Sequence, residues 1–321
     1  MAEAITDPAR LLSSLGLEGH ALAADLDSVA PGFPLRVPRA YLSRIRPGDP
    51  HDPLLRQVLP SPEESRSSPG FCADPVGDQE SMAAPGLIAK YTGRTLLITT
   101  AACAIHCRYC FRRHFPYAEA HVSGERWQGA LAYLRAHPQV AEVILSGGDP
   151  LCLNDRHLRA MAQDLCTIPH LRYMRIHSRL PVVVPSRIDE QLVGWMAQSR
   201  LRMVIVIHVN HPNEMDEAVD RAIGRLRAIG VSVFNQSVLL RGVNDRVETL
   251  VELSERLFAA GVMPYYLHLL DRVEGASHFE VPDEQALAVY DQLRRRLPGY
   301  LVPRLVRDQA GAAFKQIVGG L

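Results

Sequence analysis

Apolar and polar positions follow a repeating rhythm along residues 94–297, in which short apolar runs alternate with longer amphipathic stretches. Each apolar run has the length of a buried strand, and each amphipathic stretch has the spacing of a helix with one apolar face. The expected strands are residues 94–100, 142–146, 171–177, 202–209, 231–237 and 263–270. The expected helices are residues 127–137, 154–166, 189–199, 214–229, 245–260 and 283–297. Six successive strand–helix units predict an α/β fold with a parallel sheet, because parallel strands require crossover connections.

Unusual polar residues follow every expected strand. A cysteine-rich loop follows the first strand and SGGDP (146–150) follows the second, while the other four end in RIHSR, HVNHP, NQS and HLLD. The carboxyl ends of the strands of a barrel-like α/β fold meet on one face, where such enzymes keep their sites. A helix cap or a satisfied histidine would explain any one of these residues. Together they predict one shared site in a partial (βα)6 barrel.

The segments on either side of the six units differ in character. Residues 1–60 contain a helical stretch (9–26) and a proline-spaced basic segment, and residues 61–88 are rich in Ser, Pro and Gly. We therefore expect a helical region with an extended arm over residues 1–88, the barrel over 89–300 and a short tail over 301–321. No GxGxxG or GxxxxGK[ST] opens a helix, which argues against a Rossmann or P-loop site.

Composition narrows the functional classes. The chain has 321 residues, 47% of them hydrophobic, and its formal net charge is zero. A balanced charge argues against non-specific binding to nucleic acid or to an anionic membrane. The first residues do not have the basic and apolar segments of a signal peptide, and no apolar run has the length of a membrane span. We expect a cytoplasmic enzyme.

Three of the six cysteines, Cys103, Cys107 and Cys110, stand close together in C-x₃-C-x₂-C spacing. In a reducing compartment such a group points to metal binding or catalysis. A [4Fe–4S] cluster held by three thiolates would leave one iron free to bind a small molecule. The compactness of the loop favours this interpretation.

The alternative is a structural Cys₃His zinc site with a nearby histidine as the fourth ligand: His106, His114 or His121. Such sites more often combine pairs of cysteines that are distant in sequence. The remaining cysteines are scattered, and we interpret them as ordinary thiols: Cys72, Cys152 and Cys166.

Lysine is rare in this chain, since only Lys90 and Lys315 are lysines among the 35 basic residues. Arginine-rich codon usage explains the excess, so that a lysine can mark a place where arginine cannot serve. A Schiff base is such a place, because a guanidinium does not lose its proton in a protein. A solvated tail residue is the ordinary explanation for Lys315. We interpret Lys90 as a surface charge.

Several longer phrases resemble one family, the radical S-adenosylmethionine (SAM) lysine 2,3-aminomutases. They are CRYCFRRHF, ILSGGDPL, RIHSRLPVV, NHPNE, NQSVLLRGVND, PYYLHLLD and GYLVPRLVRD, between residues 85 and 315. The N-terminal phrases LRVPRAYLSRI and DPLLRQVLPSPEE extend the likeness to the short branch that makes (R)-β-lysine for elongation factor P.

The resemblance implies the chemistry. Cys103, Cys107 and Cys110 would hold the cluster, and SAM at the free iron would yield a 5′-deoxyadenosyl radical. Pyridoxal phosphate (PLP) on Lys315 would assist the 1,2-amino shift from L-α-lysine to β-lysine, so that the cofactors carry the difficult chemistry. The positions that match the SAM side of the family are Tyr109, Ser146, Gly147, Gly148, Asp149, His208 and Gln236.

The resemblance also implies the substrate contacts. Arg112 matches the arginine that binds the lysine carboxylate, a task that suits its planar guanidinium. Asp271 and Asp308 match the two acids that hold the distal ammonium, although Asp308 stands where the short branch has glutamate. Arg94 matches an arginine near PLP, and a surface charge at the strand edge is the other interpretation.

The family also implies partners: an electron donor such as flavodoxin or ferredoxin, and a functional link to elongation factor P and its lysyl-transferring enzyme. A homo-oligomer is compatible with the sequence. Two alternatives stay open, a radical SAM and PLP aminomutase for another amino acid and a non-catalytic Cys₃His zinc-binding module. Asp271 and Asp308 argue against a substrate without a distal ammonium.

Overall fold

The computed structural model of the protein describes residues 4–26 and 32–319. Parts of the expected N-terminal region (1–3 and 27–31) and the last two residues of the expected tail lie outside the described residues. Within the described residues, one ten-stranded sheet has its strands in consecutive order from β1 to β10. That order is the one a partial barrel requires. The proposed division into three segments stays a prediction.

The strands are β1 (Met82–Ala84), β2 (Leu87–Tyr91), β3 (Arg94–Thr100), β4 (Glu142–Gly147), β5 (Tyr173–Ser178), β6 (Arg202–Ile207), β7 (Ser232–Val238), β8 (Met263–His268), β9 (Arg304–Arg307) and β10 (Gln316–Ile317). The α-helices are α1 (Pro8–Ser14), α2 (Ala21–Leu26), α3 (Arg39–Leu42), α4 (Pro53–Arg56), α5 (Tyr117–Ala120), α6 (Glu125–Ala136), α7 (Asp155–Cys166), α8 (Leu180–Val183), α9 (Glu190–Ala197), α10 (Glu217–Ala228), α11 (Val247–Ala259) and α12 (Asp283–Arg296). Short 3₁₀ helices span Pro62–Ser65, Pro150–Cys152, Pro185–Arg187, Pro212–Glu214, Ser277–Phe279 and Gly299–Leu301.

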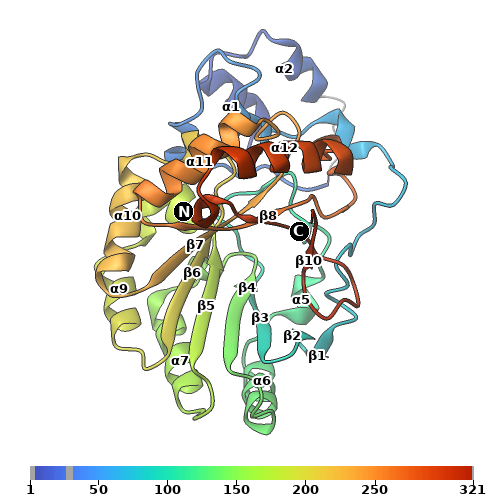
Figure 1. The fold of residues 1–321 in the computed structure, drawn as a ribbon. Coiled ribbons are helices and arrows are strands. Elements are labelled where there is room, and N and C mark those ends of the chain that lie inside the picture. Colours follow the sequence, from blue (N-terminus) through green and yellow to red (C-terminus); the bar gives the residue numbers. More distant parts are fainter. Residues whose placement is uncertain (1–3, 27–31, 320–321) are drawn as a thin grey trace.

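The six expected strand–helix units are confirmed as β3 to β8 with helices α6, α7 and α9 to α12. Strands β3 to β9 pair in parallel, each with the next in sequence. Figure 1 shows the strands side by side, with α10 and α11 along the outer side of the sheet. The sequence analysis did not predict β9, which adds a seventh parallel strand and places Asp308 directly after its end.

Antiparallel strands complete both edges of the sheet. β2 runs antiparallel to β3 through a tight turn at Gly93, whose φ of 82° lies in the left-handed region that favours glycine. β10 runs antiparallel to β9 at the opposite edge. The expected arm over residues 61–88 therefore ends in part of the sheet, since β1 and the start of β2 lie within it.

Side chains alternate between the two faces of the parallel strands, as the strand geometry requires. On β4, Val143 and Leu145 belong to the main hydrophobic core together with α6 and α7 residues such as Leu131 and Leu158. Ile144 and Ser146, which alternate with them, line a cavity on the other face. The sheet thus separates a helix-covered core from the site.

The N-terminal region packs on the same core, through Leu11, Leu12 and Leu54. The expected helical stretch over residues 9–26 contains two helices, α1 and α2, because the backbone leaves the helical conformation at Gly16, where φ is 68°. The amide of Leu17 then donates to the carbonyl of Leu12 and closes the end of α1. No helix among the described residues is both long and apolar enough to cross a membrane.

Candidate active site

A cavity of about 250 Å³ lies on the inner face of the sheet. Alternate residues of successive strands line it, such as Arg94 on β3, Ser146 on β4 and Gln236 on β7. Every candidate residue from the sequence reaches this one cavity: Arg94, Cys103, Cys107, Tyr109, Cys110, Arg112, Ser146, Gly147, Gly148, Asp149, His208, Gln236, Asp271, Asp308 and Lys315. The expectation of one shared site is therefore met by the geometry.

The cysteine loop follows β3 and carries Cys103, Cys107 and Cys110. Backbone bonds to the N-terminal region hold it, since the amide of His106 donates to Arg36 O (3.0 Å) and that of Arg108 donates to Gln57 O (2.9 Å). Burial, together with neighbouring thiols, raises the pKa of Cys103 and raises that of Cys110 to about 11. A bound metal would be needed to hold such thiols as thiolates.

The geometry of this loop does not form a closed site for a single metal ion. Among the described residues, no three His, Cys, Asp or Glu side chains converge on one ion position. The histidines of the zinc alternative contact backbone carbonyls instead, at Pro34 (from His106), Glu274 (from His114) and Tyr117 (from His121). Separated thiols suit a cluster in which each cysteine binds its own iron.

Gly147, the last residue of β4, and Gly148, which follows it, make room for this loop. A Cβ atom on Gly148 would lie 2.4 Å from Ala102 O, and one on Gly147 would lie 2.6 Å from Thr100 O. The carboxylate of Asp149 accepts from the Ser178 hydroxyl (2.7 Å) and from several backbone amides, and burial raises its pKa to about 6. Close backbone packing and loop anchoring are thus the local roles of this segment.

His208 and Gln236 contact each other across the ends of β6 and β7, with 2.7 Å between the imidazole Nε2 and the amide nitrogen. Burial and the cation of Arg179 lower the pKa of His208 to about 3, so the neutral imidazole accepts the amide proton. Tyr109 accepts a 2.7 Å hydrogen bond from Asn210 and lies edge-on against Phe279. His208 and Gln236 therefore form a hydrogen bond between neighbouring strand ends at the cavity wall.

Arg112 is held by two neighbours. Its Nε donates to Asp78 Oδ2 (2.7 Å) and its Nη1 donates to Ser146 Oγ (2.9 Å). The second oxygen of Asp78 lies 2.5 Å from Lys90 Nζ. The interpretation of Lys90 as a surface charge is wrong, because this ammonium is largely buried at the cavity wall and also donates to Val76 O (2.6 Å).

Lys315 lies at the cavity in contact with an acid. Its ammonium pairs with Asp308 Oδ2, while Tyr91 donates to Asp308 Oδ1 (3.0 Å). Burial raises the pKa of Asp271 to about 7, although the positive charge of Lys315 acts to lower it. Asp308 and Lys315 are therefore in direct contact, and Asp271 lines the same cavity. Arg94 stacks on the ring of Tyr91 (4.7 Å) and joins this end of the cavity.

Several further residues line the cavity. Asp78 was not expected there, and His177, Arg179 and His268 were expected only as members of the strand-end phrases RIHSR and HLLD, without a role of their own. Within the part of the chain that the structure describes, the Nε2 atoms of His177 and His268 are buried without a hydrogen-bond partner. Both stand at cavity-facing positions of β5 and β8, so the alternation along these strands was the signal that could have identified them. Orphaned nitrogens at a cavity wall suit a polar ligand.

Comparison with known proteins identifies the family. The sequence matches the Radical SAM superfamily over residues 97–254. It is 49% identical to an L-lysine 2,3-aminomutase of Escherichia coli (strain K12), over 98% of this chain and 92% of that protein. This chain belongs to the lysine 2,3-aminomutase family. A Haemophilus influenzae enzyme of the same name is 44% identical over 99% of this chain and 94% of its own. A Clostridium subterminale enzyme is 40% identical over 86% of this chain and 66% of its own.

Membership of the lysine 2,3-aminomutase family confirms the resemblance and the α/β radical SAM fold. It implies a [4Fe–4S] cluster, SAM and PLP as cofactors. The residues present fit these groups. Three separated thiols are available for the cluster, Lys315 is available for PLP, and the orphaned nitrogens of His177 and His268 are available as polar contacts in the cavity.

Proposed function

We propose that the protein is a lysine 2,3-aminomutase that converts L-α-lysine to (R)-β-lysine. The observation that carries the proposal is the single cavity that joins three thiols, an arginine held for carboxylate binding, and a lysine beside two acids. When bound, the cluster and SAM supply a hydrogen-abstracting radical, and PLP holds the migrating nitrogen.

The proposed roles of the residues follow from their charges. Cys103, Cys107 and Cys110 bind the cluster, and the loop backbone around Gly148 keeps them in place. The SAM side of the cavity is lined by Tyr109, by the hydrogen-bonded His208 and Gln236, and by the segment Ser146, Gly147, Gly148 and Asp149.

Arg112 binds the substrate carboxylate. Asp78 and Ser146 fix its guanidinium, so less rotational freedom is lost when the substrate binds. Asp271 and Asp308 hold the distal ammonium of lysine, which needs anionic partners in a buried site. Lys315 is the amine that carries PLP, with Arg94 beside it. Asp308 already pairs with the Lys315 ammonium, so it is placed to bind the distal ammonium of the substrate in exchange for that of Lys315.

The test is anaerobic reconstitution with iron, sulfide and PLP, followed by incubation with L-lysine, SAM and dithionite and chiral chromatography of the products. We expect (R)-β-lysine from the wild type and none from Lys315→Arg. Borohydride reduction and peptide mapping should place the pyridoxyl group on Lys315. A brown, reconstituted protein that turns over another amino acid but not lysine would contradict the substrate assignment.

We further propose that the β-lysine serves elongation factor P through its lysyl-transferring enzyme, and that a flavodoxin or ferredoxin supplies the electron. The motifs shared with the short branch support this link. In a coupled assay with lysine, SAM, a reductant and the lysyl-transferring enzyme, elongation factor P should gain a lysyl group that chiral chromatography after hydrolysis identifies as β-lysyl, and only when this protein is present. Equal modification with chemically supplied α-lysine would argue against it.

A further inference from the structure

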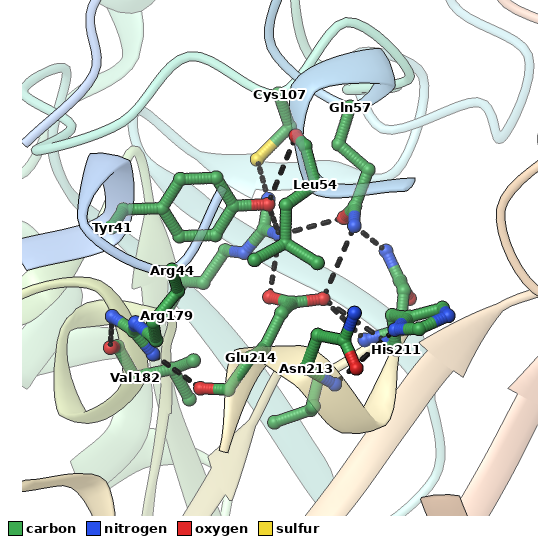
Figure 2. A network of polar contacts seen from close by, with 12 residues as sticks. Tyr41, Arg44, Leu54, Gln57, Cys107, Arg179, Val182, His211, Asn213 and Glu214 are labelled. Atoms are coloured by element: carbon green, nitrogen blue, oxygen red, sulfur yellow. Dashed lines mark hydrogen bonds and ion pairs between the residues drawn. The ribbon is translucent and has the colours of Figure 1, made fainter. Parts of the chain in front are cut away.

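Arg179 occupies an unusual position next to the cysteine loop. It follows β5, and its buried guanidinium lies between the Cys107 sulfur and the Glu214 carboxylate (Figure 2). Nη1 lies 2.6 Å from Cys107 Sγ, and Nη2 lies 2.8 Å from Glu214 Oε2. One cation is therefore shared by a cluster ligand on one side and an acid on the other.

The surroundings fix the guanidinium in this place. Nη2 also donates to Gln57 Oε1 (2.7 Å), and the rings of Tyr41 and Tyr109 lie 5.4 and 5.7 Å from the guanidinium carbon. The backbone amide of Arg179 donates to Asp149 Oδ2 (2.7 Å). These contacts come from the N-terminal region, the cysteine loop and the segment after β4. The cation cannot turn away from Cys107 without losing several of them.

Glu214 is equally well anchored. It has no exposed surface, and its Oε1 accepts from the amide of Asn210 (2.9 Å) and from Gln57 Nε2 (3.2 Å). Figure 2 shows its carboxylate on the side of Arg179 that faces away from the Cys107 sulfur. Burying two full charges is costly, and a buried pair is weak evidence for a contribution to stability. A functional reason for the pair is therefore worth seeking.

The charge order, thiolate then cation then carboxylate, has a direct consequence for electron transfer. Reduction adds one electron to a cluster and makes it and its thiolates more negative. A cation in hydrogen-bond contact with one thiolate stabilises the reduced form, and hydrogen bonds to the sulfurs are a known means of setting the potential. An anion behind that cation acts in the opposite direction, because it offsets part of the positive field.

We propose that Arg179 raises the reduction potential of the cluster through Cys107 and that Glu214 is the counter-charge that limits this effect. The inference rests on the cluster of the proposed function. The step is the transfer of one electron from an external one-electron reductant, such as dithionite, to the oxidised cluster, with no bond formed or broken. Arg179 and Glu214 act through Cys107 and Arg179 respectively, and neither needs to touch the substrate.

The experiment is a redox titration of the reconstituted protein with dithionite and mediators, without SAM or lysine, followed by electron paramagnetic resonance. In Arg179→Gln, the ratio of reduced to oxidised cluster at a fixed potential should fall at least tenfold, which is a shift of about 59 mV for a one-electron couple. In Glu214→Gln, the ratio of reduced to oxidised cluster at the same potential should rise. The reduction potential of Arg179→Lys should lie between those of Arg179→Gln and the wild type. Lysine keeps the positive charge but lacks the planar guanidinium that contacts Cys107 and Glu214 together.

A matched control is Arg187→Gln, which breaks a largely buried ion pair with Asp155 instead of a contact with a cysteine of the loop. It should leave the potential unchanged. The proposal is overturned if Arg179→Gln and Glu214→Gln shift the potential in the same direction, or by no more than Arg187→Gln, at normal iron content. If Arg179→Gln does not bind iron, the reduction potentials of the other proteins decide. Arg179→Lys should have the lowest potential, the wild type the next and Glu214→Gln the highest, and any other order overturns the proposal. Failure of the wild type to bind four irons would instead refute the proposed function.

Discussion

Replacing Asp78 by asparagine removes one buried charge that two cations share. The Asp78 side chain is 4% exposed and pairs with Arg112 (2.7 Å) and Lys90 (2.5 Å), both at the cavity wall. Burial acts to raise the pKa of Asp78, but the Arg112 guanidinium and the Lys90 ammonium overcome it and hold the pKa below its usual value. Asp78→Asn keeps the shape of the side chain and leaves both cations without their anion.

The expected loss of stability in Asp78→Asn follows from the burial of Asp78, Arg112 and Lys90. Removing one partner of a buried ion pair costs about 3–5 kcal/mol, whereas an exposed pair contributes about 0–1 kcal/mol. Because Asp78 serves two largely buried cations, we expect the free energy of unfolding to fall by about 4 kcal/mol, or roughly a thousandfold in the folding equilibrium. A lowered carboxyl pKa contributes stability above the unfolded value near 4 and loses it as the pH falls through the folded value. The difference should thus be constant from about pH 6 to 8.

Urea unfolding of the apoprotein, followed by circular dichroism, measures this loss. The matched control is Asp283→Asn, which breaks an ion pair with Arg307 at the surface, where the two side chains are 50% and 36% exposed. We expect the control to lose less than about 1 kcal/mol. The reasoning is refuted if the two variants lose equal stability. In the reconstituted enzyme, Asp78→Asn should also raise KM for lysine, because Arg112 loses the contact that orients it.

Three further predictions concern the cavity. Burial raises the pKa of Asp271 to about 7, and the ammonium of the substrate lysine needs the ionised carboxylate. The value of kcat/KM for lysine should therefore rise about tenfold from pH 6 to 8. The same rise in Asp271→Asn would contradict this prediction. Gly148→Ala should displace the cysteine loop, because its Cβ would lie 2.4 Å from Ala102 O, and should reduce the iron bound on reconstitution at least twofold. Gly129→Ala, with open space around its Cβ, is the control and should bind iron normally. Alanine at Cys103, Cys107 or Cys110 should abolish the brown chromophore, while alanine at Cys72, Cys152 or Cys166 should not; four irons per chain in Cys107→Ala would exclude that ligand.

The long amphipathic helices and the apolar strands could be predicted from the sequence because each repeats one period over many residues. α12 begins at the expected residue, Asp283, and β3 has the expected bounds. β9 was missed because its four residues follow a proline and are too short to show a period. β2 was missed because its first residues adjoin the Ser-, Pro- and Gly-rich arm, although Gly93 between two apolar runs is a hairpin signal.

The candidate residues could be predicted as a group but not in their pairings. Strand ends converge in any parallel barrel, so Ser146, His208 and Gln236 were expected on one face. That Arg112 pairs with Asp78 depends on where the arm crosses the cavity, and no local pattern encodes a contact between residues 34 positions apart. The same holds for Arg179, whose partners come from three separate segments.

The N-terminal region supplies the partners that the cysteine loop needs. Arg108 and Arg113 of this loop are buried, and both donate to the carboxylate of Glu64, at 2.7 Å in each case. Gln57 accepts from Arg179 and bonds the loop backbone at Arg108. A buried guanidinium without an anion or acceptor is strongly destabilising, so these arginines require the residues before β1. The parallel strands therefore position the thiols, and the N-terminal region neutralises and fixes the cations around them. The reactivity of the candidate site depends on both parts of the chain.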